Sequence, residues 1–107
     1  MLLEAKADVD FVGPLDTSPL KLASRFDDMS MMQALIQANA DVNKTDKHHS
    51  QTPLHAACAI GSTATVSMLL NNNANPDVPD VYGHKPLHYA NLRGEEGMVA
   101  LLNTMTD

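Results

Sequence analysis

The hexapeptide Thr52-Pro53-Leu54-His55-Ala56-Ala57 stands in the middle of a chain of 107 residues and predicts how the chain folds. A Thr hydroxyl can accept a hydrogen bond from a free amide at a helix N-terminus, and Pro suits the first helical position, where no amide hydrogen is required. The hexapeptide therefore predicts the beginning of a helix, with Leu54 as an apolar side chain in its first turn.

The same pattern recurs on both sides of this hexapeptide. Ser18-Pro19-Leu20-Lys21 precedes it and Lys85-Pro86-Leu87-His88 follows it, so the three copies begin at positions 18, 52 and 85, which are 34 and 33 residues apart. Within each unit a second apolar block follows, as in Val66-Ser67-Met68-Leu69-Leu70. Similarity at a fixed period of this length is the signature of a repeat protein. Each unit is predicted to form a helix, a turn, a second helix and a loop.

The units differ where the first helix begins and ends. Lys85 stands at the capping position of the third unit, and its side chain cannot cap, so that helix should begin less firmly. Gly61 and Gly94 separate the two helices of their units, where a left-handed backbone is expected, and Asp27 holds that position in the first unit. The loop at 44–51 is one residue longer than its counterparts, so a bulged or mobile loop is expected there.

These motifs resemble the ankyrin repeat, whose signature T-P-L-H-x-A recurs about every 33 residues. The central hexapeptide matches the signature fully, and the third unit departs only at Lys85. The first unit has Ser18 in place of Thr, which is conservative, and Lys21 in place of His. The resemblance covers essentially the whole chain and implies an all-α solenoid of stacked antiparallel helix pairs with projecting, hairpin-like loops. It divides the single domain at 1–107 into the end of a truncated repeat at 1–10 and three repeats at 11–43, 44–77 and 78–107. We therefore expect the chain to be part of a larger protein.

The histidines allow a metal site or a structural role. In ankyrin repeats the His of the motif resembles a structural post that bonds to neighbouring loop backbone, and His55 and His88 hold that position. The spacings His55-x2-Cys58 and His84-x3-His88 look superficially like metal-ligand pairs. The structural role is favoured, because Cys58 stands where the repeat carries a small buried residue. We expect no metal, no cofactor and no catalytic residue, and so a protein that is not an enzyme.

Two further features have more than one interpretation. Methionines can form an adaptable binding surface, but four of the seven fall on core positions of second helices: Met31, Met32, Met68 and Met98. Asn43 begins a glycosylation sequon, which a protein inside the cell would not use. Asn43 also resembles the asparagine that some ankyrin repeats present for hydroxylation.

The composition sets limits on the partners. A formal charge of −6 disfavours nucleic acid and anionic membranes, because binding to both depends on Lys and Arg. Cys58 is the single cysteine, so the chain has no internal disulfide, which fits a reducing compartment. No apolar run approaches the roughly 20 residues that span a bilayer. We expect a monomeric intracellular domain, cytoplasmic or nuclear, that does not insert directly into membranes.

The resemblance also locates a binding surface. Ankyrin repeats bind partners with their loop tips and with the concave side of their first helices. Carried over by position, the loop candidates for protein binding are Leu15, His48, His49, Tyr82 and His84. The candidates on first helices are Arg25, Phe26, Ile60, Leu92 and Arg93. Apolar and aromatic anchors together with Arg are the composition of binding hot spots.

The expected function is therefore a protein–protein interaction module. It would bind a protein or peptide segment that carries an apolar anchor and an acidic residue near Arg25 or Arg93. One alternative is a structural spacer within a longer ankyrin array, and another is an accessory domain of an effector or signalling enzyme. The apolar rings could also fold down onto neighbouring loops instead of facing a partner.

Overall fold

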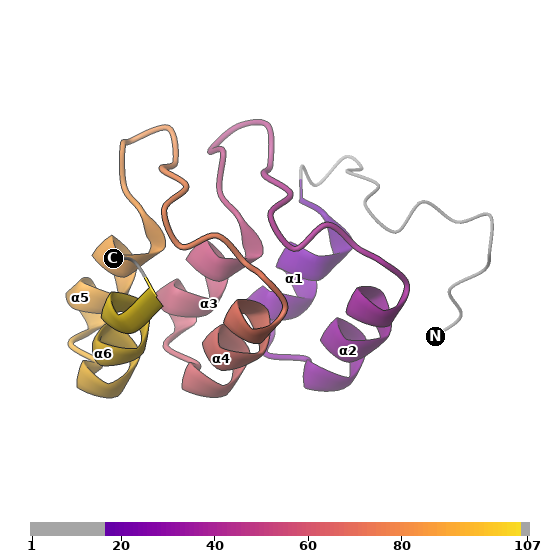
Figure 1. The fold of residues 1–107 in the computed structure, drawn as a ribbon. Helices are drawn as coiled ribbons and strands as arrows, with labels where there is room; N and C mark the ends of the chain where they lie inside the picture. Colours follow the sequence, from indigo (N-terminus) through magenta and orange to yellow (C-terminus); the bar gives the residue numbers. More distant parts are fainter. Residues whose placement is uncertain (1–16, 106–107) are drawn as a thin grey trace.

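The computed structural model describes residues 17–105, which form six helices. They are paired as α1 (Pro19–Arg25) with α2 (Met29–Gln37), α3 (Pro53–Ile60) with α4 (Thr63–Asn71), and α5 (Pro86–Arg93) with α6 (Glu96–Met105). Figure 1 shows the three pairs side by side, with the loops that precede α3 and α5 projecting upward above these helices. Residues 17–105 contain no strand, which confirms the predicted all-α fold. The truncated repeat expected at 1–10 and the candidate Leu15 lie outside the described residues.

The helices form two layers. The inner helices α1, α3 and α5 pack against one another in that order, and each outer helix packs against the inner helix of its own pair. Because α3 has an inner helix on both sides, every residue from Pro53 to Cys58 is buried. This dependence of burial on the neighbouring pair is the general property of repeat proteins.

The helix starts follow the sequence prediction. The Ser18 hydroxyl accepts a hydrogen bond from the Lys21 amide at 3.2 Å, and the Thr52 hydroxyl accepts one from the His55 amide at 3.3 Å. Lys85 makes no side-chain cap, as its chemistry predicts. In all three inner helices Pro occupies the first turn, where it removes no helical hydrogen bond.

The turns between paired helices are also as predicted. Gly61, Gly94 and Asp27 have φ angles of 82°, 72° and 57°, all in the left-handed region. Asp27 also forms a contact between helix pairs, because its carboxylate accepts hydrogen bonds from the hydroxyls of Ser62 (2.8 Å) and Thr65. These bonds lower the pKa of Asp27 and connect the first helix pair to the start of α4.

Two loops project from the helices, and each is numbered by the repeat that it begins. They are the second finger (44–51), before α3, and the third finger (78–84), before α5. The Asp46 amide donates to the Gln51 carbonyl at 3.1 Å, whereas the Asp80 amide donates to the His84 carbonyl at 2.9 Å. The second finger therefore holds its extra residue between these two backbone groups, which is the predicted bulge. Ser50 supplies a φ of 55° there.

The core is built from small and aliphatic side chains. Leu20, Leu54, Met32 and Met98 are fully buried, together with Cys58, Leu35, Leu69 and Leu102. The methionines Met31 and Met68 are half-buried against this core, which agrees with a packing role. Leu87, the counterpart of Leu54 in the third pair, is only partly buried, because no further described helix pair covers α5. Within residues 17–105 no helix has the length and apolar character to cross a membrane.

The central position of Leu54 gives a stability prediction. Leu54→Ala should lower the free energy of unfolding by about 2–5 kcal/mol, the usual cost for a buried Leu. Leu92→Ala makes the same change at a side chain that is 71% exposed, and should cost less than about 0.5 kcal/mol. Urea unfolding followed by circular dichroism compares the two variants. Equal losses would contradict the assignment of Leu54 to the core.

Candidate functional site

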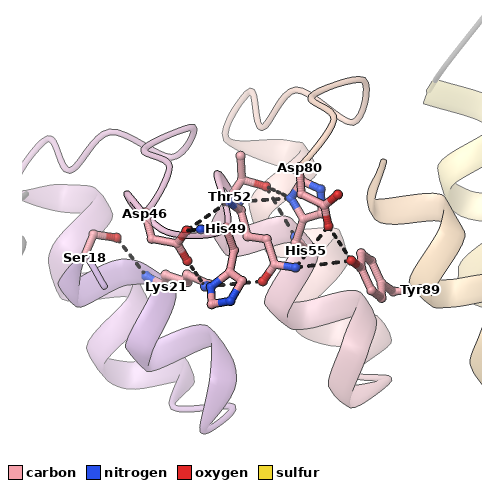
Figure 2. A network of polar contacts seen from close by, with 9 residues as sticks. Ser18, Lys21, Asp46, His49, Thr52, His55, Asp80 and Tyr89 are labelled. Atoms are coloured by element: carbon pink, nitrogen blue, oxygen red, sulfur yellow. Dashed lines mark hydrogen bonds and ion pairs between the residues drawn. The ribbon is translucent and has the colours of Figure 1, made fainter. Parts of the chain in front are cut away.

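The second finger rests on a buried carboxylate at its base. Asp46 accepts hydrogen bonds from the backbone amides of His49 (2.9 Å) and Gln51 (3.3 Å). It also forms an ion pair with Lys21 from α1, and the two side chains are 2% and 8% exposed. Figure 2 shows this pair at the junction between α1 and the finger. Lys21, which departs from the His of the repeat motif, thus connects the first helix to the next finger.

The third finger has the same arrangement with different partners. Asp80 accepts hydrogen bonds from the amides of Tyr82 (3.0 Å) and His84 (2.9 Å). Its second carboxylate oxygen accepts from the Gln51 side-chain amide at 3.1 Å and from the Tyr89 hydroxyl. Because Gln51 also accepts from Lys21 at 3.5 Å, one chain of polar contacts runs across all three helix pairs.

Both carboxylates stay ionised. Burial alone would raise the pKa of Asp46, but the hydrogen bonds from Lys21, Gln51 and His49 outweigh it and hold the pKa below its usual range. Burial alone would likewise raise the pKa of Asp80. The hydrogen bonds from Tyr89, His84, Gln51 and Tyr82 outweigh this effect and hold its pKa well below the usual range. Burial and the hydrogen bond to Asp80 raise the pKa of Tyr89 to about 12, so Tyr89 remains a neutral donor.

His55 is the structural post that the motif predicts. Its Nδ1 accepts a hydrogen bond from the Thr52 amide at 3.0 Å, so its Nε2 carries the ring proton. That Nε2 donates to the His84 carbonyl at 2.9 Å and connects α3 to the third finger. Burial lowers the pKa of His55, which favours this neutral form.

A hollow of about 330 Å³ lies between α1, α3 and the second finger. Three predicted binding residues line it: Arg25 from α1, His49 from the finger and Ile60 from α3. The hollow is completed by Lys21, Gln51, Ala56 and Ala59. The two alanines and Ile60 give it an apolar wall, while Arg25 and His49 supply hydrogen-bond donors.

A row of rings continues from this hollow along the fingers. The ring of Tyr82 has its centroid 6.3 Å from that of His49 and 6.2 Å from that of His84. The rings of His84 and His88 stack with centroids 3.6 Å apart. The Val81 amide donates to the His49 carbonyl at 2.9 Å, which joins the two fingers. Tyr82 is 63% exposed, so its ring does not fold down onto the loops.

The other predicted residues lie apart from this hollow. Phe26 is 72% exposed and lines a separate hollow of about 270 Å³ with Leu22 and Met31. Leu92 is exposed at the end of α5, and His48 is exposed on the second finger. The sequence therefore grouped Phe26 with Ile60, whereas the structure separates them.

Arg93 reaches back to the preceding helix pair. Its guanidinium donates to the Ala59 carbonyl at 3.4 Å, close to the C-terminus of α3. A Cβ atom at Gly61 would lie only 2.3 Å from the Nε of Arg93. The left-handed φ of 82° is what favours Gly at position 61, and the Arg93 side chain packs against it. Sequence reasoning identified the left-handed turn and missed the contact with Arg93.

The other candidate chemistry has structural explanations. Among the described residues no group of three or more His, Cys, Asp or Glu could hold a metal ion. The Asn43 side chain accepts a hydrogen bond from the Asn75 amide at 2.6 Å and donates to the Asn73 carbonyl at 3.4 Å. Asn43 thus connects the loop after α2 to the equivalent loop after α4. Cys58 lies in the core, where burial raises the pKa of its thiol to about 12.

Stacked helix pairs with projecting fingers define a helical-repeat module of the class that binds other proteins. A family model described as "Ankyrin repeats (3 copies)" matches residues 1–106, and the chain belongs to the ankyrin-repeat family. Ankyrin repeats are in general protein-interaction modules and are not themselves catalytic.

Relatives share the repeat and differ otherwise. Palmitoyltransferase ZDHHC17 of Danio rerio is 40% identical over 65 residues, which are 61% of this chain and 10% of that protein. E3 ubiquitin-protein ligase hecd-1 of Caenorhabditis elegans is 34% identical over 91 residues, 85% of this chain and 3% of that protein. NF-kappa-B inhibitor alpha of Homo sapiens is 32% identical over 102 residues, 90% of this chain and 32% of that protein. The chain thus spans a minor part of each of these proteins.

The neutral state of His55 predicts a pH dependence of stability. Below about pH 6.5 the unfolded chain protonates this His, while the lowered pKa keeps it neutral in the folded chain. The unfolded state then binds more protons than the folded state. The free energy of unfolding therefore falls as the pH drops through the pKa of the unfolded His, which is about 6.5. His55→Gln retains a capping-box residue at that position and should reduce this slope. Urea titrations at several pH values measure it, and identical slopes would contradict the assignment.

The buried thiol gives a prediction about reactivity. Cys58 should not react with a thiol reagent such as Ellman's reagent in the folded chain, because its side chain is inaccessible and its pKa is raised to about 12. In urea it should react fully. Rapid labelling of the folded chain would show that α3 opens readily.

Proposed function

We propose that the chain binds an extended peptide segment of another protein in the groove between the fingers and the inner helices. The groove consists of the hollow beside Arg25 and Ile60 and of the ring row of His49, Tyr82 and His84. The observation that carries the proposal is the distribution of exposed apolar side chains. Within the described residues, all the large ones lie on the third finger or at the ends of inner helices: Phe26, Ile60, Val81, Tyr82 and Leu92.

The chemistry of the groove supports a binding role. Exposed apolar side chains that gather on one side usually mark an interaction surface. Ile60 lines the hollow together with Arg25 and the imidazole of His49, which can orient a polypeptide by hydrogen bonds. Tyr and Arg are enriched among the residues that dominate binding energies.

The rigidity of the fingers also supports the proposal. Binding is weakened when loops must be ordered at the moment of contact. The amides of both fingers are already held by Asp46 and Asp80, and the Val81–His49 hydrogen bond joins one finger to the other. A peptide would therefore meet a groove whose walls are in place.

A spacer role has less support. A spacer needs only the faces that contact neighbouring repeats, and it would not favour apolar side chains on the fingers. The role of accessory domain is compatible with the proposal, since the relatives named above include a palmitoyltransferase and a ubiquitin ligase. The intracellular location, the monomeric state and the absence of nucleic-acid binding remain predictions from the sequence.

A matched pair of substitutions tests the groove. Peptides would first be selected from a displayed random library on the wild-type chain. Ala59→Trp adds a large ring at an exposed position in the hollow, and should lower the affinity for these peptides about tenfold or more. Ala64→Trp makes the same change at an exposed position of the outer helix α4, and should leave their affinity unchanged.

Isothermal titration calorimetry gives the affinities, and circular dichroism checks that both variants fold. Peptides that bind the Ala59→Trp variant at full strength would contradict binding in the groove. A selection that enriches no peptide on the wild-type chain would also count against the proposal.

A further inference from the structure

The cations around the groove are not equivalent. Lys21 is neutralised by its buried ion pair with Asp46. The guanidinium of Arg93 is held at the Ala59 carbonyl and against Gly61. Arg25 is exposed, lines the hollow, and has no ion pair or hydrogen bond from its side chain to another residue of the range 17–105. Arg25 is therefore the cation that remains available to a ligand in the hollow.

The two ends of the groove also differ in charge. At the second finger, the negative charge of Asp46 is cancelled by Lys21. At the third finger, Asp80 accepts hydrogen bonds from the side chains of Gln51 and Tyr89 and from two backbone amides, all of which are neutral donors. The charge of Asp80 is thus stabilised locally but not cancelled. An acidic ligand group is favoured beside Arg25 and disfavoured above Asp80.

Among residues 17–105, no carboxylate forms an ion pair with Arg25. None of the residues that line the hollow is acidic. The other carboxylates of the described residues lie in the turns between paired helices, at the first residue of α6 and in the loops that follow α2 and α4: Asp27, Asp28, Glu95, Glu96, Asp41 and Asp77. Asp27 already accepts from two hydroxyls, and Asp77 lies 3.7 Å from Lys85.

We infer that the bound segment has a fixed polarity, with a carboxylate side chain paired with Arg25 and an uncharged residue at Tyr82 and His84. This inference rests on the proposed binding in the groove and specifies its ligand. Between the two ends, an apolar side chain of the segment packs on Ala59 and Ile60. The exposed ring of Tyr82, next to that of His84, suits an aromatic side chain, which stacks on it without bringing negative charge close to Asp80.

The Arg25–carboxylate pair is partly open to solvent, which limits its strength. Exposed ion pairs contribute up to about 1 kcal/mol, which corresponds to about a fivefold change in affinity. The contribution should shrink at high salt, because mobile ions screen exposed charges. Both properties can be measured.

The experiment uses the peptides that lose affinity for the Ala59→Trp variant. Arg25→Gln should lower the affinity for an acidic peptide about fivefold. Arg93→Gln is the matched control and should leave this affinity nearly unchanged. Replacing the peptide's Asp or Glu by Asn or Gln should cause the same loss on the wild-type chain and no further loss on the Arg25→Gln variant. A peptide of reversed sequence should bind more weakly, because its carboxylate would lie above Asp80.

The outcomes separate the inference from the proposal on which it rests. If the peptides are sensitive to Ala59→Trp but carry no carboxylate, the inferred polarity of the bound segment is wrong, and the proposed binding in the groove is retained. Equal losses for Arg25→Gln and Arg93→Gln, or additive losses in the chain and the peptide, would overturn the inference in the same way. If no selected peptide is sensitive to Ala59→Trp, the binding site itself is wrong. Thermal melting serves as the folding check, since Arg25 is exposed and its replacement should not shift the midpoint.

Discussion

The carboxylates of Asp46 and Asp80 hold the two fingers in place, and the candidate site depends on them. A loop that projects from a helical layer has backbone amides that its own carbonyls cannot satisfy. Each carboxylate accepts two of these amides: those of His49 and Gln51 in one finger, and those of Tyr82 and His84 in the other. The finger side chains of the groove, those of His49, Gln51, Tyr82 and His84, are attached to these same residues. Without the carboxylates, these amides would lose their hydrogen-bond acceptors within the protein, and the rings would lose their fixed positions.

The position of the motif His connects each inner helix to the next finger, and the chain solves this connection in two ways. His55 uses a neutral ring nitrogen to donate to the His84 carbonyl. Lys21 holds the equivalent position in the first unit, and its longer, charged side chain reaches the carboxylate of Asp46. Both keep helix and finger together. Only Lys21 also cancels a negative charge, and it does so beside the hollow that Arg25 lines. The departure from the motif therefore changes the charge of the groove while it preserves the link.

Much of the fold could be predicted from the sequence, because the determining interactions are local. The caps at Ser18 and Thr52, the missing cap at Lys85 and the turn at Gly61 depend on residues a few positions away. The site was less predictable. Adjacent residues on a helix point about 100° apart, since the helix has about 3.6 residues per turn. Arg25 lines the hollow shared with the second pair, whereas Phe26 lines a hollow within the first pair.

Arg93 shows the same limit for a polar residue. From the sequence, Arg25 and Arg93 are interchangeable as partners for an acidic group. They differ because Arg93 stands one position later in its unit and reaches back to the Ala59 carbonyl, next to a glycine that leaves room for it. That contact lies between residues 34 positions apart in the sequence. It depends on how closely two helix pairs approach, which the residues of a single unit do not specify.

The charge of the whole chain is a poor guide to what its groove binds. A formal charge of −6 suggests repulsion of acidic ligands, but exposed charges are screened beyond about 8 Å at physiological salt. The residues that line the hollow include Arg25 and no carboxylate, and the nearby carboxylate of Asp46 is paired with Lys21. The acidic residues nearest to the fingers, Asp46 and Asp80, are buried because the finger amides require acceptors. The interaction that builds the fingers therefore also removes exposed carboxylates from the groove, and the ion pair with Lys21 makes one end of it more favourable to a carboxylate than the other.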